Sequence, residues 1–122
     1  MKYAILFREP SDVMAHRTDP ARAEGYWAGW MSYVAAINAS GMVTGGAGLD
    51  LPATATFVRV RDGERQIQEG PFGETHDELG GFFLVEADDL DAVLEWAARS
   101  PAAAVGSVEV RPVLPPPPSA AE

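Results

Sequence analysis

The sequence predicts a single α+β domain in which two β-α-β units flank a β-hairpin. Three observations support this fold class. The chain has 122 residues, which is the usual size of one domain. Apolar runs of strand length alternate with two longer helical stretches. The dipeptide Asp62-Gly63 separates two short alternating segments, a pattern typical of a tight hairpin turn.

The first β-α-β unit is expected over roughly residues 2–49. A buried strand is predicted at 2–7, followed by an irregular stretch at 8–18. Asp19-Pro20 combines an N-cap side chain with a proline suited to the first helical position, so a helix is expected from there to about Ser40, with Gly41 ending it.

The strand expected at 42–49 turns glycine-rich towards its end. The segment Gly45-Gly46-Ala47-Gly48 lacks the following Gly-Lys-Ser/Thr of a phosphate-binding loop. Close approach of another backbone segment is therefore the favoured interpretation.

The remaining elements follow from alternation, turn residues and helix signals. They are strands at 54–61, 64–69, 81–86 and 105–111, a loop at 69–78, and a helix that Asp88-Asp89 begins and Pro101 ends. The proline-rich segment 114–122 is expected to be a disordered tail, so the domain proper is residues 1–113.

Together these elements resemble a ferredoxin-like split βαβ sheet. One helix per unit covers only one face of that sheet, although strands such as Ala4-Ile5-Leu6-Phe7 are apolar on both sides. A homodimer that covers the second face is therefore expected. The first helix also carries small residues opposite its aromatic arc, which fits either an alanine-rich solvent face or a subunit contact.

Composition excludes several classes of function. There is no cysteine, so disulfides, thiolate metal ligands and a cysteine nucleophile are excluded. His16 and His76 are too few and too far apart to predict a metal site, and no cofactor is expected. The net charge of −9 disfavours nucleic acid and anionic membranes, and the apolar runs are too short for a bilayer span, so a cytoplasmic location is expected.

The segment Glu69-Gly70-Pro71-Phe72-Gly73-Glu74-Thr75, with Arg59-Val60-Arg61-Asp62-Gly63 before it and Leu79-Gly80-Gly81-Phe82 after it, resembles the YCII-related family, in particular its branch named for an Asp-Gly-Pro-Phe motif. The resemblance extends over about residues 1–113 and implies a ferredoxin-like fold that forms a dimeric α/β barrel. It also implies relatives that include a dehydrochlorinase-like enzyme and proteins associated with sigma factors. Glu69 replaces the motif's leading aspartate. No histidine lies in residues 20–40, where part of the family carries one of a His-Asp pair.

The candidate catalytic residues are His76, Glu69 and Glu74, since a histidine oriented by carboxylates can exchange a proton near neutral pH. Arg59 and Arg111 are candidates to bind a carboxylate, either that of Glu69 or that of a ligand. Candidate pocket residues are Phe72, Trp27 and Trp30. A solvated loop, surface ion pairs and ordinary core packing are the alternative explanations of the same residues, and they are the more common ones.

Two functions remain open from the sequence. One is a cofactor-independent enzyme that performs proton transfer or elimination on a small organic molecule. The other is a non-catalytic module that binds a small ligand or a regulatory partner.

Overall fold

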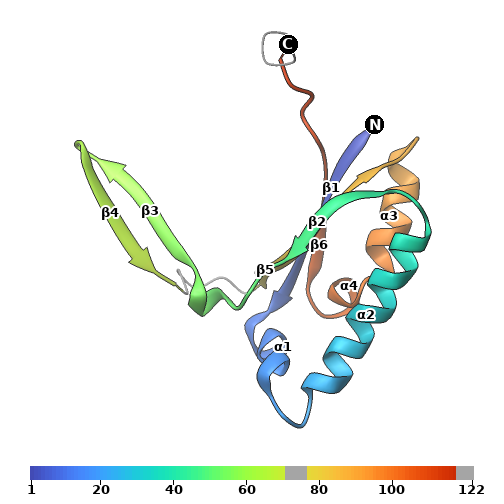
Figure 1. The fold of residues 1–122 in the computed structure, drawn as a ribbon, viewed down its shortest axis with the longest axis horizontal. Coiled ribbons are helices and arrows are strands. Elements are labelled where there is room, and N and C mark those ends of the chain that lie inside the picture. The colour runs from blue at the N-terminus through green and yellow to red at the C-terminus, as the bar shows by residue number, and fades with distance from the viewer. Residues whose placement is uncertain (71–76, 118–122) are drawn as a thin grey trace.

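The computed structural model describes residues 1–70 and 77–117, and its centre is a four-stranded antiparallel sheet (Figure 1). The strands are β1 (Lys2–Pro10), β2 (Val43–Gly48), β5 (Asp77–Glu86) and β6 (Ser107–Pro112), in the spatial order β2-β5-β1-β6. Each β-α-β unit thus has a strand of the other unit between its own two strands. This is the split βαβ arrangement, and the predicted α+β ferredoxin-like fold is confirmed.

Helices α2 (Ala23–Ala39), α3 (Leu90–Ala98) and α4 (Pro101–Val105) pack on one face of the sheet (Figure 1). The hydrophobic core lies between these helices and the sheet. Burial of the side chains alternates along β1, so that Ile5 and Phe7 are buried while Leu6 is only partly covered. Ile37 of α2 and Val93 of α3 complete this core. Among the described residues, no helix is long and apolar enough to cross a membrane.

The other face of the sheet carries no helix in the described part of the chain. The cross-strand pairs Ala4↔Leu84 and Leu6↔Phe82 lie on this face. The expectation of helices on only one face is therefore confirmed, whereas the second copy that would cover the other face stays a prediction.

Helix α2 begins later than expected, because Asp19 is used in a turn. Its carboxylate accepts a hydrogen bond from the amide of Ala21 (2.9 Å), and its carbonyl accepts those of Arg22 and Ala23. The helix then begins at Ala23 without a side-chain cap. Its end is as predicted, since Gly41 has a φ of +79° in the left-handed region.

The segment expected to be irregular at 8–18 is largely regular. Strand β1 continues to Pro10, and helix α1 (Ser11–Met14) and a 3₁₀ turn, η1 (Ala15–Thr18), follow it. Strand β5 likewise begins at Asp77, inside the segment predicted as a loop. Pro101 follows the end of α3 as expected, but it is also the first residue of α4. The Ser100 hydroxyl caps this helix by accepting a hydrogen bond from the Ala103 amide.

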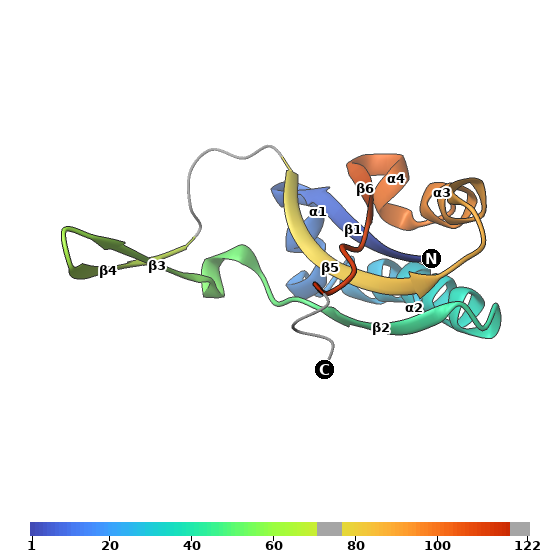
Figure 2. The same ribbon diagram turned by 90° about the horizontal axis from the view of Figure 1, so that it is seen from above.

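The predicted hairpin is confirmed. Strands β3 (Thr56–Arg61) and β4 (Glu64–Glu69) form a separate two-stranded sheet. Asp62 (φ 54°) and Gly63 (φ 77°) form the turn between them. Figures 1 and 2 show this ribbon extending well away from the main sheet, connected to β2 through the 3₁₀ turn η2 (Pro52–Thr54).

Candidate functional site

A cavity of about 580 Å³ lies between the N-terminal half of α2 and the end of the main sheet. Its walls are chiefly aromatic and aliphatic, with contributions from Phe7, Trp27, Trp30, Val34 and Phe83. The backbone from Gly46 to Leu51 forms another wall, where β2 leaves the sheet. This volume is within the range that small-molecule sites occupy in proteins.

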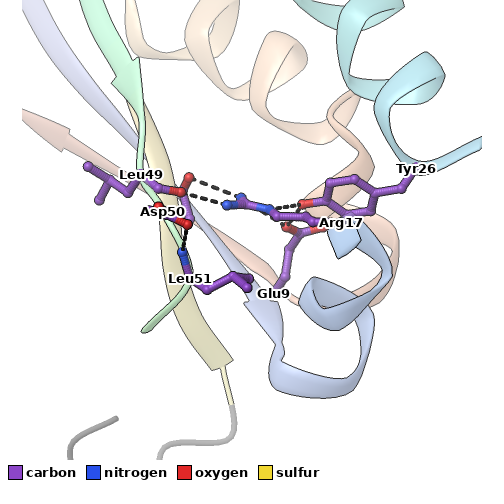
Figure 3. Close-up of polar contacts among 7 residues, drawn as sticks. Glu9, Arg17, Tyr26, Leu49, Asp50 and Leu51 are labelled. Carbon is purple, nitrogen blue, oxygen red and sulfur yellow. Dashed lines mark hydrogen bonds and ion pairs between the residues drawn. The ribbon is translucent and has the colours of Figure 1, made fainter. Parts of the chain in front are cut away.

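Glu9 supplies a carboxylate to the wall of this otherwise apolar cavity. Its side chain is only 2% exposed, because β1 turns it to the same face as Phe7. Oε1 accepts a 2.5 Å hydrogen bond from the Tyr26 hydroxyl and lies 3.9 Å from the Arg17 guanidinium (Figure 3). Within residues 1–70 and 77–117, these two interactions account for the polar contacts of Glu9.

Arg17 connects three segments around Glu9. Its Nε donates to the Tyr26 hydroxyl (2.9 Å), and its two terminal nitrogens donate to the carbonyl oxygens of Leu49 (2.5 Å) and Gly80 (3.2 Å) (Figure 3). The guanidinium also lies 5.2 Å from the Trp27 ring centroid. These bonds use three of its five N–H groups, which leaves two N–H groups to donate to a ligand.

Gly80 is required by this arrangement. A Cβ at this position would lie 2.8 Å from an Arg17 terminal nitrogen and 3.1 Å from the Met14 methyl group. Gly46 is required for two other reasons. Its φ is +148°, which other residues rarely adopt, and a Cβ at this position would lie only 2.5 Å from the Phe82 carbonyl oxygen. The glycine-rich strand end thus serves close backbone approach, as the sequence indicated.

The two tryptophans of α2 line the cavity in different ways. Trp27 is largely at the surface and stacks edge-on against Tyr26, with ring centroids 4.9 Å apart. Trp30 packs edge-on against Phe7 at 5.1 Å. The Trp30 indole nitrogen is buried and has no hydrogen-bond partner among the described residues. Trp27 and Trp30 are therefore well placed to contact a ligand.

The phenols of Tyr26, which is half-buried, and of Tyr33, which is buried, both have raised pKa values. Desolvation by burial, and secondly the hydrogen bond to Glu9, raise the pKa of Tyr26 to about 12. Burial also raises the pKa of Tyr33, to about 12, and its hydroxyl donates to the Trp96 carbonyl (2.9 Å). Tyr26 therefore stays protonated at neutral pH, so that it donates to Glu9 rather than accepting a proton from it.

We predict that stability falls as the pH rises from about 10 to about 12. In this range the unfolded chain loses the Tyr33 proton while the folded chain keeps it, so the unfolded state is favoured; below pH 10 there is no effect. The pKa of Tyr33 in the folded chain is about 12 instead of 10, and this difference corresponds to about 2–3 kcal/mol in the free energy of unfolding. Denaturation at several alkaline pH values should show this loss, and Tyr33→Phe should reduce it. An equal loss in Tyr33→Phe would contradict the assignment.

The structure places the residues proposed from the sequence in separate regions. Glu69 and Arg59 lie on the exposed β3-β4 ribbon. Arg111 is an exposed residue of β6 and donates a hydrogen bond to Glu109, which also accepts one from Arg8 (3.3 Å). Glu109 is therefore its carboxylate partner in the described part of the chain, in place of Glu69, which was one of the two alternatives considered. These hydrogen bonds, that from Arg111 first, lower the pKa of Glu109.

Glu74, His76 and Phe72 lie outside the described residues. Their proposed roles therefore remain predictions from the sequence.

Sequence reasoning missed the polar side chains that the structure brings together, namely Glu9, Arg17 and Tyr26. A signal for Glu9 was present. Tyr3, Ile5 and Phe7 alternate inward, and extending that period by one step places Glu9 on the buried face. No sequence pattern predicted the position of Arg17, because it is held by hydrogen bonds to carbonyl oxygens of two segments that are distant in the sequence.

Comparisons with known proteins agree with this fold. The model of the YCII-related domain matches residues 1–116, which is nearly the whole chain. The chain belongs to the YCII-related family. A curated relative, the uncharacterized protein R00369 of Rhizobium meliloti (strain 1021), is 39% identical over 66 residues, which is 52% of this chain and 53% of that protein. The match thus spans about half the length of each.

A solved structure shares the architecture of this YCII-related chain at low sequence identity. It is the 5-chloro-2-hydroxyhydroquinone dehydrochlorinase TftG of Burkholderia phenoliruptrix AC1100, in complex with 2,5-dihydroxybenzoquinone. The TM-score is 0.55 at 14% identity, with 93% of this chain and 94% of that chain covered. At this identity the likeness supports the fold alone.

Proposed function

We propose that the cavity beside α2 binds a small, flat organic molecule and that Glu9 exchanges a proton with it. The observation that carries this proposal is a carboxylate only 2% exposed in the wall of a largely apolar cavity. Burying an ionisable group is costly, and such groups in clefts are frequent participants in function. Simple core packing does not require a carboxylate at this position.

The neighbours of Glu9 suit acid–base chemistry. Tyr26 holds Oε1 through its hydrogen bond, and Oε2 is the atom proposed to exchange the proton. Arg17 keeps two N–H groups for an oxygen of the ligand, where they stabilise the negative charge that develops when a proton is removed. The aromatic walls formed by Phe7 and Trp30 favour a ring over an extended chain.

The reaction proposed is proton abstraction next to a carbonyl group. Glu9 takes the proton from carbon, the electron pair moves into an enolate, and Arg17 hydrogen-bonds the enolate oxygen. If the ring carries a leaving group on the carbon next to the deprotonated one, the electron pair of the enolate then forms a carbon–carbon double bond while that group departs as an anion. Both outcomes balance without a cofactor.

The fold relative in complex with 2,5-dihydroxybenzoquinone supports this ligand class and supplies a probe. The alternative proposal is a module that binds such a molecule without converting it. Enzyme-dependent exchange of a ligand proton separates the two, because only a catalyst accelerates it.

We also infer from the sequence motif that the chain belongs to the Asp-Gly-Pro-Phe branch of the family. A homodimer that covers the bare sheet face through Leu6, Phe82 and Leu84 is part of the same proposal. It predicts about 26 kDa in light scattering, twice the 13.0 kDa of one chain. A protein that stays monomeric at micromolar concentration would contradict the dimer.

The binding site is tested by filling the cavity. Gly48 lines it, and a Cβ built there meets no atom within 4 Å, so Gly48→Leu can occupy the space without backbone strain. Gly25→Leu is the matched control, because Gly25 is equally open but lies outside the cavity. In calorimetric titration with 2,5-dihydroxybenzoquinone we expect Gly48→Leu to weaken binding at least tenfold and Gly25→Leu to leave it unchanged. Equal binding by both variants would refute this site.

A further inference from the structure

The indole N–H of Trp30 is a buried donor that the described residues leave without an acceptor. Trp30 lines the cavity beside α2, and its Nε1 has no hydrogen-bond partner within residues 1–70 and 77–117. Buried polar groups in proteins are nearly always paired, because a donor that leaves water without finding an acceptor loses its hydration energy. This N–H therefore needs an acceptor that the described part of the chain does not supply.

Two aromatic contacts fix the ring of Trp30 in the cavity wall. Its centroid lies 5.1 Å from that of Phe7 and 5.9 Å from that of Tyr33, and both contacts are edge-on. Phe7 and Tyr33 belong to the buried core, so the indole cannot turn its N–H to the solvent without breaking these contacts. The donor is therefore held in place before a ligand arrives.

We propose that Trp30 determines specificity by donating this hydrogen bond to the ligand. Arg17 binds one oxygen of the ligand ring, and Nε1 of Trp30 binds a second acceptor at the other end of the ring. The ligand class is thus a flat ring with hydrogen-bond acceptors at opposite ends. This inference rests on the proposed function of the cavity, which it deepens.

The spacing along α2 places the two donors at opposite ends of such a ring. Tyr26 accepts a hydrogen bond from Arg17 (2.9 Å) and precedes Trp30 by four residues. The two side chains therefore lie on the same face of the helix, about 6 Å apart along its axis. This rise is similar to the distance between substituent atoms on opposite carbons of a six-membered ring. An acceptor on a carbon next to the first oxygen is too close to Arg17 to reach Trp30.

The cavity wall around Trp30 is apolar. Val34 follows Trp30 by about one turn of α2, and Phe83 packs edge-on against Phe7 with ring centroids 5.9 Å apart. In such surroundings a hydrogen bond is stronger than in water, and an unpaired donor is more costly. A site of this kind rejects an analogue that lacks the acceptor more strongly than one that merely differs in size.

The test compares hydroquinone with 4-methylphenol, which has the same shape but carries a methyl group in place of the second oxygen. NMR titrations give the dissociation constants of both probes for wild type, Trp30→Phe and Trp27→Phe. Phenylalanine keeps an aromatic ring but has no N–H, and Trp27 is the matched control because it lines the same cavity and is 42% exposed. We expect wild type and Trp27→Phe to prefer hydroquinone by about fivefold or more, and Trp30→Phe to lose this preference. The same preference in all three proteins would overturn the inference.

A second substitution removes the N–H and keeps the shape of the indole. In a Trp27→Phe/Trp96→Phe background, benzothienylalanine replaces Trp30 alone and has a sulfur atom in place of the N–H group. It should abolish the preference for hydroquinone even if Trp30→Phe is too unstable to measure, and a retained preference would contradict the role of the N–H. Resorcinol, whose second oxygen is one carbon closer to the first, tests the position of the acceptor. A preference for resorcinol over 4-methylphenol that depends on Trp30 would contradict acceptors at opposite ends.

The outcomes distinguish this inference from the proposed function. If both probes bind and position 30 does not affect the preference between them, Trp30 is not the determinant, and the proposed function stands. If the preference depends on Trp30 but Glu9→Gln exchanges ligand protons at the wild-type rate, the role of Glu9 is wrong and recognition by Trp30 stands. If wild type binds neither probe, this inference is wrong, and the proposed function then depends on 2,5-dihydroxybenzoquinone alone.

Discussion

Glu9→Gln should lower the protein-dependent exchange of ring protons in 2,5-dihydroxybenzoquinone by two to four orders of magnitude. This is the usual size of a general acid–base contribution. The amide is nearly isosteric and still accepts the Tyr26 hydrogen bond. Exchange requires a deuteron to be added to the ring carbon, with an enol O–H bond giving up its proton, and the original proton then to be removed from the resulting tetrahedral carbon; an amide can neither deliver the deuteron nor take that proton. Exchange in D₂O can be followed by proton NMR under saturating ligand, with the reaction without protein as the reference.

Glu86→Gln is the matched control, because Glu86 is an exposed carboxylate that pairs with the N-terminus at 3.1 Å. It should exchange protons at the wild-type rate. If Glu9→Gln retains wild-type exchange, Glu9 is not the base. If wild type binds the probe but never accelerates exchange, the chain is a binding module instead of an enzyme.

Gly106→Val should destabilise the fold by about 4 kcal/mol or more, a large part of the stability of a typical domain. A Cβ at Gly106 would overlap the Arg8 carbonyl oxygen and lie 3.0 Å from the Glu9 Cα, both of which are backbone atoms that cannot move aside. Relief requires β1 to shift where it carries Glu9. Urea denaturation measures the effect.

Gly48→Val is the control for this prediction, since a Cβ at Gly48 meets nothing within 4 Å. It should change the free energy of unfolding by less than about 1 kcal/mol. Equal stability of the two variants would show that β1 and the turn before β6 do not approach each other this closely.

The strands and the hairpin were predictable because their signals are local. The short apolar run of β1, the alternation along β6 and the positive-φ pair Asp62-Gly63 are all patterns that act within a few residues. The sheet order followed from the element sequence. The start of α2 was predicted three residues too early, because the dipeptide Asp19-Pro20 is as common in a turn as at the start of a helix, and here it forms a turn.

The candidate site was not predictable to the same extent. Trp27 and Trp30 were proposed from the helical arc, and both line the cavity. Arg17 acquires its role only when β5 brings the Gly80 carbonyl and the β2 end brings the Leu49 carbonyl to the same place. Such long-range convergence leaves no periodic trace in the sequence. Glu9 was missed because its strand was predicted to end at Phe7, three residues before the observed end at Pro10.

A ¹⁵N NMR titration of the tryptophan indole groups with 2,5-dihydroxybenzoquinone tests directly whether the cavity beside α2 is a ligand site. Trp27→Phe and Trp30→Phe assign the signals, and Trp96, which lies outside the cavity, serves as the internal reference. If the ligand binds in this cavity, we expect saturable shifts of the Trp27 and Trp30 signals with one common dissociation constant, abolished in Gly48→Leu, and no shift of Trp96. Shifts at Trp96 alone, or saturable binding that moves neither Trp27 nor Trp30, would contradict a ligand site in this cavity.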